Sequence, residues 1–145
     1  MGVRWRTVAA CAFAGAVIAA CAPQPQVATS QRPGAYPTLE AYKRLVARRI
    51  VQRARDVYSE PMPEVMKSVV VLDITIDREG GLARVAVRRS NGFKALENRA
   101  MESVRRAAPF GHPAFSVRRG DGTVSFLETF LFRDDGRFQI RSLVE

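Results

Sequence analysis

The chain has 145 residues, a formal net charge of +9 at pH 7, and an apolar share of 47%. This length allows one small domain with a hydrophobic core, and this apolar share excludes a wholly disordered chain. Both cysteines, Cys11 and Cys21, lie near the N-terminus, which excludes a disulfide framework or a thiolate metal site in the remainder of the sequence.

The first 20 residues have the pattern of a bacterial secretory signal. Arg4 and Arg6 give a positive start, and a run of apolar and small residues follows over Val8–Ala20, shorter than the ~20 residues of a membrane-spanning helix. The run ends in IAAC, residues 18–21, which resembles the lipobox of bacterial lipoproteins. This resemblance implies that residues 1–20 are removed and that Cys21 is lipidated. The alternatives are an ordinary signal peptide and an uncleaved anchor.

Membrane attachment is implied by the same resemblance. Lipoproteins of this class carry several acyl chains, and more than one chain is what makes anchoring stable. Ala22 follows Cys21, where the inner-membrane retention signal of these proteins has Asp, so the resemblance favours the outer membrane, facing the periplasm, over the inner membrane. Residues 21–37 are rich in Pro, Gln, Ser and Thr, and we expect them to form a disordered tether.

A helix is predicted to begin at Thr38, a good N-cap residue, and to end near Tyr58, before Pro61. The residues that recur at helical spacing on its apolar face are Tyr42, Val46, Ile50, Ala54 and Val57. The cationic residues on the other face are Lys43, Arg44, Arg48, Arg49, Arg53 and Arg55. This basic face is either solvated or attracted to an anionic surface or partner, and a periplasmic location disfavours nucleic acid.

Alternating residues then predict a β-hairpin with one buried face. The inward residues are Val70, Leu72, Ile74 and Ile76 on the first strand, and Ala83, Val85 and Val87 on the second. The stretch REGG, residues 78–81, supplies the turn. A second helix is predicted from the spacing of Leu96, Ala100, Val104 and Ala108, and Pro109 ends it.

Residues 123–132 form a third predicted strand, rich in aromatic and aliphatic side chains. The tail Phe138–Glu145 has two interpretations: a short fourth strand that caps the third, or a segment that leaves its edge open. The sequence therefore predicts an α+β fold in the order α-β-β-α-β, with a further strand in one alternative. We expect a small antiparallel sheet with two helices packed on one face.

The pattern of turns, breaks and helix ends over Val69–Phe132 resembles that of the C-terminal domain of the TonB family, which includes TolA-like modules. The shared features are the Asp77–Gly81 turn, the break at Ser90 and Gly92, and a helix with a Pro-Phe exit. The matching residues of the helix and exit are Leu96, Glu97, Ala100, Val104, Arg105, Ala107, Pro109, Phe110 and Pro113. Asn91 and Glu97 depart conservatively from the family pattern, which usually has Ser and Asp there. The resemblance assigns residues 38–145 to a TonB C-terminal-like domain.

This resemblance implies binding by β-augmentation, in which an extended guest segment pairs with a sheet edge. In the family, the last strand of the module pairs with an outer-membrane receptor or another envelope protein. The partner-binding residues implied here are Val124, Phe126, Leu127, Glu128, Phe130 and Phe132. A link to TonB-dependent transport and a homodimer formed by strand exchange are further expectations. The alternative function is a structural, Tol-like envelope lipoprotein whose basic helix contacts anionic lipid or polymer.

Catalytic machinery is not predicted. His112 is the one histidine of the chain and lies between Gly111 and Pro113 in a predicted loop. The sequence shows no zinc cluster, Ser-His-Asp arrangement, calcium loop or Gly-rich phosphate motif. We therefore expect a binding module that is not an enzyme and uses no cofactor, metal or nucleic acid.

Overall fold

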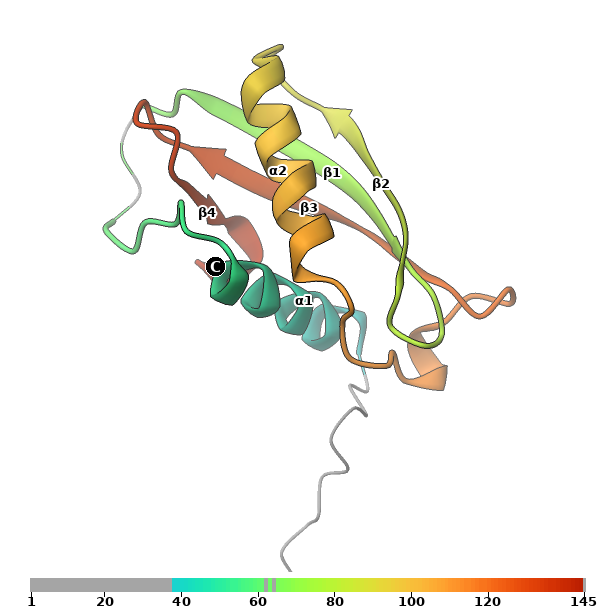
Figure 1. The fold of residues 1–145 in the computed structure, drawn as a ribbon. Helices are drawn as coiled ribbons and strands as arrows, with labels where there is room; N and C mark the ends of the chain where they lie inside the picture. The colour runs from blue at the N-terminus through green and yellow to red at the C-terminus, as the bar shows by residue number, and fades with distance from the viewer. Residues whose placement is uncertain (1–37, 62, 64, 145) are drawn as a thin grey trace, which may run out of the picture. The chain divides into compact units, whose positions relative to one another are not determined.

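The computed structural model describes residues 38–61, 63 and 65–144. The predicted signal peptide, the lipidated Cys21 and the tether lie outside the described residues. The elements are α1 (Leu39–Arg53), β1 (Ser68–Ile76), β2 (Leu82–Arg89), α2 (Lys94–Ala107), the 3-10 turn η1 (Phe115–Val117), β3 (Val124–Phe132), β4 (Phe138–Ile140) and the 3-10 turn η2 (Arg141–Leu143). The predicted α+β fold is confirmed, in its four-stranded form (Figure 1). Neither described α-helix has the length and apolarity needed to cross a membrane.

The sheet has the strand order β2-β1-β3-β4, and all neighbouring strands are antiparallel. β1 and β3 pair over their full lengths, from Ser68 opposite Phe132 to Ile76 opposite Val124. β4 has three residues and pairs with β3 only at Phe130–Phe132. The sheet therefore has a step, because β3 extends beyond β4 by the length of Val124–Thr129.

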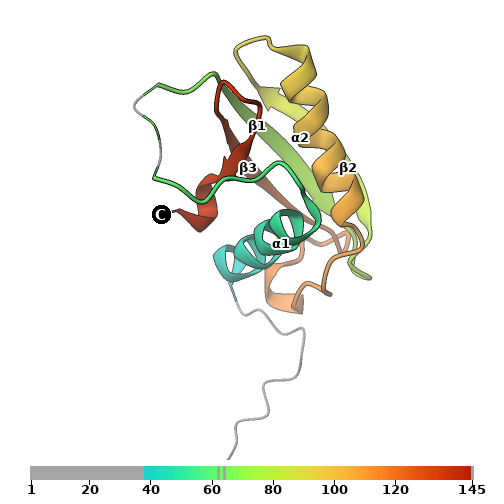
Figure 2. The same ribbon diagram turned by 60° about the vertical axis from the view of Figure 1, so that its left-hand side comes forward.

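Both helices pack on one face of this sheet (Figures 1 and 2). α2 contacts β1 and β2, whereas α1 contacts α2 and η2. The Tyr42 ring of α1 meets Phe126 of β3 edge to face, with centroids 6.5 Å apart, and the Tyr42 hydroxyl donates to the Gly111 carbonyl over 2.7 Å. The core side chains of the two helices are Tyr42, Val46, Ala47, Ile50, Ala100, Val104 and Ala107. The sheet contributes Val70, Leu72, Ile74, Ile76, Val124, Phe126, Phe130, Phe132, Phe138 and Ile140.

α1 ends at Arg53, earlier than the predicted end near Tyr58. Ala54 is extended, with φ −84° and ψ 148°, and the chain then runs beside β4. The Phe138 N–H donates to the Asp56 carbonyl over 2.9 Å, and the Tyr58 N–H donates to the Phe138 carbonyl over 3.2 Å. The longer helix was a wrong prediction because this distant pairing satisfies the backbone groups that further helical turns would have satisfied internally.

β2 contains a bulge that the alternation of residues did not predict. Thr75 lies opposite Arg84, but the next residue, Ile76, lies opposite Leu82, so Ala83 has no cross-strand partner on β1. An extra residue of this kind turns the following side chains to the other face. Leu82 therefore lies over the core in place of Ala83, which is exposed, contrary to its predicted inward direction.

The break between β2 and α2 is held by side-chain hydrogen bonds. The Ser90 hydroxyl donates to a Glu97 carboxylate oxygen, and this bond is the largest cause of the lowered pKa of Glu97. Asn91 donates through Nδ2 to the Lys67 carbonyl over 3.0 Å, and its Oδ1 accepts from the Ser68 hydroxyl over 2.5 Å. Of the two residues that depart from the TonB-family pattern, Asn91 thus fastens the break to the start of β1, and Glu97 fastens α2 to Ser90 at the end of β2.

Candidate functional site

Part of one edge of β3 has no strand partner in the described chain. The Phe132 carbonyl accepts from the Lys67 N–H on the β1 side, and the Arg133 N–H donates to the Arg137 carbonyl on the β4 side, each over 2.9 Å. Because backbone groups alternate between the two sides of a strand, even-numbered β3 residues face β1 and odd-numbered ones face away. Since β4 stops opposite Phe130, the N–H and C=O groups of Ser125 and Leu127 lie at an open edge. We call Val124–Thr129 the open β3 edge.

The six predicted partner-binding residues differ in exposure. Leu127 is 48% exposed and lies on the face of the sheet that the helices do not cover. The other five are buried on the helix-covered side: Val124, Phe126, Glu128, Phe130 and Phe132. Phe130 and Phe132 also pair with strands on both sides, so they lie outside the open β3 edge. The positions available to a guest are therefore the backbone of the open β3 edge and the side chain of Leu127.

A groove of about 310 Å³ lies beside the open β3 edge, between α1, β3 and η2. Its lining residues are Glu40, Lys43, Arg44, Val71, Leu127, Glu128, Thr129, Arg141 and Ser142. Three of these side chains are cationic, and Glu128, one of the two acids, is buried. The electrostatic character of the groove is therefore positive.

Glu128 is a carboxyl group buried within the sheet, with 1% of its surface exposed. Its oxygens accept hydrogen bonds from the Ser142 hydroxyl, over 2.6 Å, and from the Thr129 N–H, over 2.9 Å. Burial raises the pKa of Glu128, and the hydrogen bonds and nearby Lys43 oppose that rise. Glu128 therefore connects β3 to the tail, and its carboxylate already accepts hydrogen bonds from within the chain.

The tail combines the two interpretations offered by the sequence. Phe138 and Ile140 are buried core residues, so β4 is a structural part of the sheet. After Ile140 the chain turns into η2 and leaves the remaining β3 edge open. The sequence prediction missed this three-residue limit because Arg141–Val144 carry no turn residue such as Gly or Pro.

The outer edge of β4 is closed by the linker after α1. Besides the bonds of Asp56 and Tyr58 to Phe138, the Gln139 side chain donates to the Glu60 carbonyl over 2.8 Å. Glu60 also forms ion pairs with Arg133 and Arg137 of the β3–β4 turn, at 3.6 and 3.5 Å. This closure leaves the open β3 edge as the part of that side of the sheet where backbone groups can accept a guest strand.

The outer edge of β2 is the other exposed edge of the described sheet. It carries Arg84, Arg88 and Arg89, and it is interrupted by the bulge at Ala83. Charged side chains and bulges are the devices by which proteins discourage pairing at an exposed strand. The open β3 edge is therefore the better candidate site.

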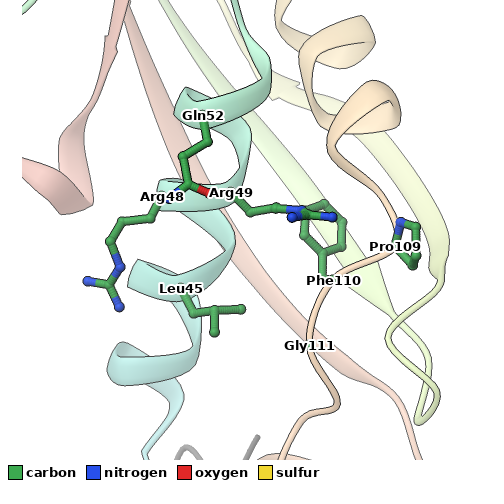
Figure 3. Close-up of a pocket in the computed structure, with 7 residues that line it drawn as sticks. All are labelled: Leu45, Arg48, Arg49, Gln52, Pro109, Phe110 and Gly111. Atoms are coloured by element: carbon green, nitrogen blue, oxygen red, sulfur yellow. The ribbon is translucent and has the colours of Figure 1, made fainter. Parts of the chain in front are cut away.

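A second hollow lies between α1 and the segment that follows α2 (Figure 3). Its volume is about 520 Å³, and its lining residues are Leu45, Arg48, Arg49, Gln52, Pro109, Phe110 and Gly111. The Phe110 N–H donates to the Gly80 carbonyl over 2.7 Å, and Gly111 accepts the Tyr42 hydroxyl. These bonds fix the position of one wall of the hollow. We call the hollow the α1 pocket.

Within residues 38–61, 63 and 65–144, no three His, Cys, Asp or Glu side chains are arranged to hold a metal ion. His112 is exposed in the loop between α2 and η1. Comparisons of the chain with protein-family models, with curated proteins and with solved structures find no match.

Proposed function

We propose that this protein is a lipid-anchored periplasmic adaptor of the TonB C-terminal type. It binds an extended segment of an envelope protein or outer-membrane receptor by β-augmentation, with a link to TonB-dependent transport. The observation that carries the proposal is the open β3 edge, where Ser125 and Leu127 present backbone donors and acceptors that no described strand satisfies. Such groups bind an added strand through main-chain hydrogen bonds.

The surroundings of the open β3 edge support this role. Phe126, directly between the two exposed backbone positions, packs on Tyr42, and β1 pairs with the whole of β3. The edge is thus held rigidly, and a rigid edge reduces the entropy lost when a guest becomes ordered. Leu127 offers an apolar contact, and the positive groove favours a guest that carries acidic side chains.

The anchor part of the proposal rests on Cys21. Residues 22–37 would separate a lipidated Cys21 from α1, and this segment spans about 55 Å when fully extended. A guest must then lie close to the membrane that holds the anchor. Metabolic labelling with a radioactive fatty acid tests this point, because the label should be incorporated by the native chain and absent from Cys21→Ser.

The strand-pairing part is tested by Leu127→Pro with Leu127→Ala as the matched control. Proline removes the Leu127 N–H from the open edge and is tolerated in edge strands, whereas alanine keeps the N–H and removes the side chain. Val124 is a poorer position for proline, because its backbone faces β1 and its side chain is buried. We expect photocrosslinking from Ser125 to capture an envelope protein in the native chain and in Leu127→Ala, and to fail in Leu127→Pro.

Amide hydrogen exchange supplies the second measurement. Bound guest should slow exchange at Ser125 and Leu127 and leave the outer residues of β2 unchanged. Equal capture by the proline and alanine variants, or protection of β2 instead of β3, would contradict binding at this edge. Raised salt should weaken capture only modestly, because main-chain hydrogen bonds are less sensitive to screening than ion pairs between exposed charges.

A further inference from the structure

α1 carries five cationic side chains and one acidic one, Glu40, so its net charge is +4. The cationic residues are Lys43, Arg44, Arg48, Arg49 and Arg53. No ion pair joins any of these five to a carboxylate in the described part of the chain. On α2, by contrast, Arg105 and Arg106 both pair with Glu102, at 4.0 and 3.8 Å. Among the described residues the cations of α1 therefore have no ion-pair partner, whereas on α2 Glu97 and Glu102 pair with three of the four cations.

The cationic surface of α1 borders an apolar hollow. Arg44 and Arg48 are one helical turn apart and exposed, while Arg49 extends from α1 toward Phe110 (Figure 3). Leu45 and Phe110 provide the apolar part of the α1 pocket, and no acidic residue lines it. The surface thus combines guanidinium groups with a small apolar recess. The boundary of a bilayer offers a match for both, because charged headgroups lie there beside the start of the acyl chains.

We propose that this face of α1 docks on the anionic phosphate headgroups of a phospholipid bilayer. The docking residues are Arg44, Arg48 and Arg49, with the α1 pocket taking the apolar region just below the headgroups. Each arginine close to an anionic bilayer strengthens binding about fivefold. This inference does not depend on strand pairing at β3.

The arrangement favours a bilayer over a protein guest. The cationic groups extend along α1 from Lys43 to Arg53, which is about 15 Å of helix, and a flat charged surface can reach all of the outward ones together. α1 is also the first described element after the N-terminal segment that contains the predicted anchor. A domain tethered there meets the membrane at high effective concentration, so even modest headgroup affinity orients it.

The test uses the full chain with Cys21→Ser, so that acylation plays no part, and measures co-sedimentation with vesicles. Equimolar phosphatidylglycerol and phosphatidylcholine supply the anionic bilayer, and pure phosphatidylcholine shows any contribution of the apolar N-terminal run. Arg48→Gln with Arg49→Gln should weaken the anionic-specific binding about 30-fold. Arg84→Gln with Arg88→Gln, on β2, removes the same charge and should weaken it less than about threefold. Circular dichroism checks that both pairs fold.

Two further arms identify the ligand. Arg48→Lys with Arg49→Lys should retain most of the binding, because a bilayer responds to charge, whereas a carboxylate guest held by bidentate guanidinium groups would be lost. Inorganic phosphate at millimolar concentration should not release the protein from vesicles. Equal effects of the α1 and β2 pairs, absence of any excess over neutral vesicles, loss of binding in the lysine variant, or release by free phosphate would each overturn the proposal.

Discussion

Ser142 donates a hydrogen bond from its hydroxyl to the buried carboxyl of Glu128, over 2.6 Å, where the tail leaves the sheet. Both residues have less than a tenth of their surface exposed. The bond joins η2 to β3 at the border of the open β3 edge, and it places an ionisable group beside the aromatic core. The stability of the protein and the position of its tail should therefore depend on the same side chain.

The first prediction concerns pH. Burial raises the pKa of Glu128 in the folded state above its ordinary value of 4.5, so the folded state binds this proton more tightly than the unfolded state. The contribution of Glu128 to the free energy of unfolding should be largest below pH 4.5 and should decline as pH rises through the folded-state pKa. In thermal melts across this range, the stability of the native chain relative to Glu128→Gln should decline as pH rises.

The glutamine variant is the control for other titrating groups. Hydrogen bonds and neighbouring arginines lower the pKa values of Glu60 and Asp135, so these groups lose stabilisation as pH falls, which is the opposite direction. They are common to both proteins, so the difference between the two melting curves isolates Glu128. A difference that does not vary with pH would show that Glu128 does not titrate with a raised pKa.

The second prediction concerns β4 as part of the core. Phe138 is fully buried, and its ring centroid lies 5.1 Å from that of Phe130 and 5.5 Å from that of Phe132. Phe138→Ala should lower the free energy of unfolding by about 3–5 kcal/mol, measured by urea denaturation. Phe115→Ala is the matched control, because Phe115 is 87% exposed and its loss should cost less than about 0.5 kcal/mol. Similar costs for the two variants would show that β4 does not contribute to the core.

The third prediction concerns the tail beyond β4. A deletion that begins at Phe138 would remove core residues, so the informative deletion removes residues 141–145 and keeps β4. It leaves Glu128 without the Ser142 hydroxyl and removes Leu143, which packs against the core, so it should cost at least about 1–3 kcal/mol of stability. It also uncovers more of β3, so guest binding or self-association should increase, measured by crosslinking and sedimentation velocity. Unchanged association together with the expected loss of stability would mean that η2 does not restrict the edge.

The fourth prediction concerns Gly80 in the β1–β2 turn. Gly80 has φ +89°, and a Cβ atom there would lie 2.3 Å from the Phe110 carbonyl oxygen, part of the wall of the α1 pocket. Gly80→Ala should therefore destabilise the fold by about 1–3 kcal/mol and displace Phe110. Gly120→Ala meets open space at an ordinary φ and should have little effect. Urea denaturation and the near-ultraviolet circular dichroism of the two variants separate these outcomes.

Local patterns in the sequence predicted most of the elements and the order of the fold. Val70, Leu72, Ile74 and Ile76 alternate into the core as expected, because a half-buried strand leaves a period of two in the sequence. The end of α1, the bulge at Ala83 and the limit of β4 were not predicted. The end of α1 depends on a contact between distant segments, Asp56 with Phe138, and periodicity carries no information about such contacts.

The candidate site was predicted in part. The resemblance predicted the third strand as the site. The structure narrows the open backbone groups to Ser125 and Leu127, because β1 and β4 pair with most of the remainder and the Thr129 N–H donates to the Glu128 carboxylate. No pattern in the sequence predicted the α1 pocket apart from the basic residues of α1, because the other wall of the pocket, Pro109–Gly111, lies far along the chain. The resemblance to the TonB family supplied the idea of strand pairing, and the shortness of β4 specifies where it can occur.

If a guest strand binds at the open β3 edge as proposed, the step between β3 and β4 also sets how long that guest stays. Two residues offer at most four backbone hydrogen bonds, and at about 0.5–1.5 kcal/mol each these contribute about 2–6 kcal/mol before ordering costs. That corresponds to dissociation constants of tens of micromolar or weaker, and therefore to residence times of about milliseconds at ordinary association rates. A domain that binds in this way would exchange partners rapidly, and sustained contact would require that the proposed anchor and the guest belong to the same membrane.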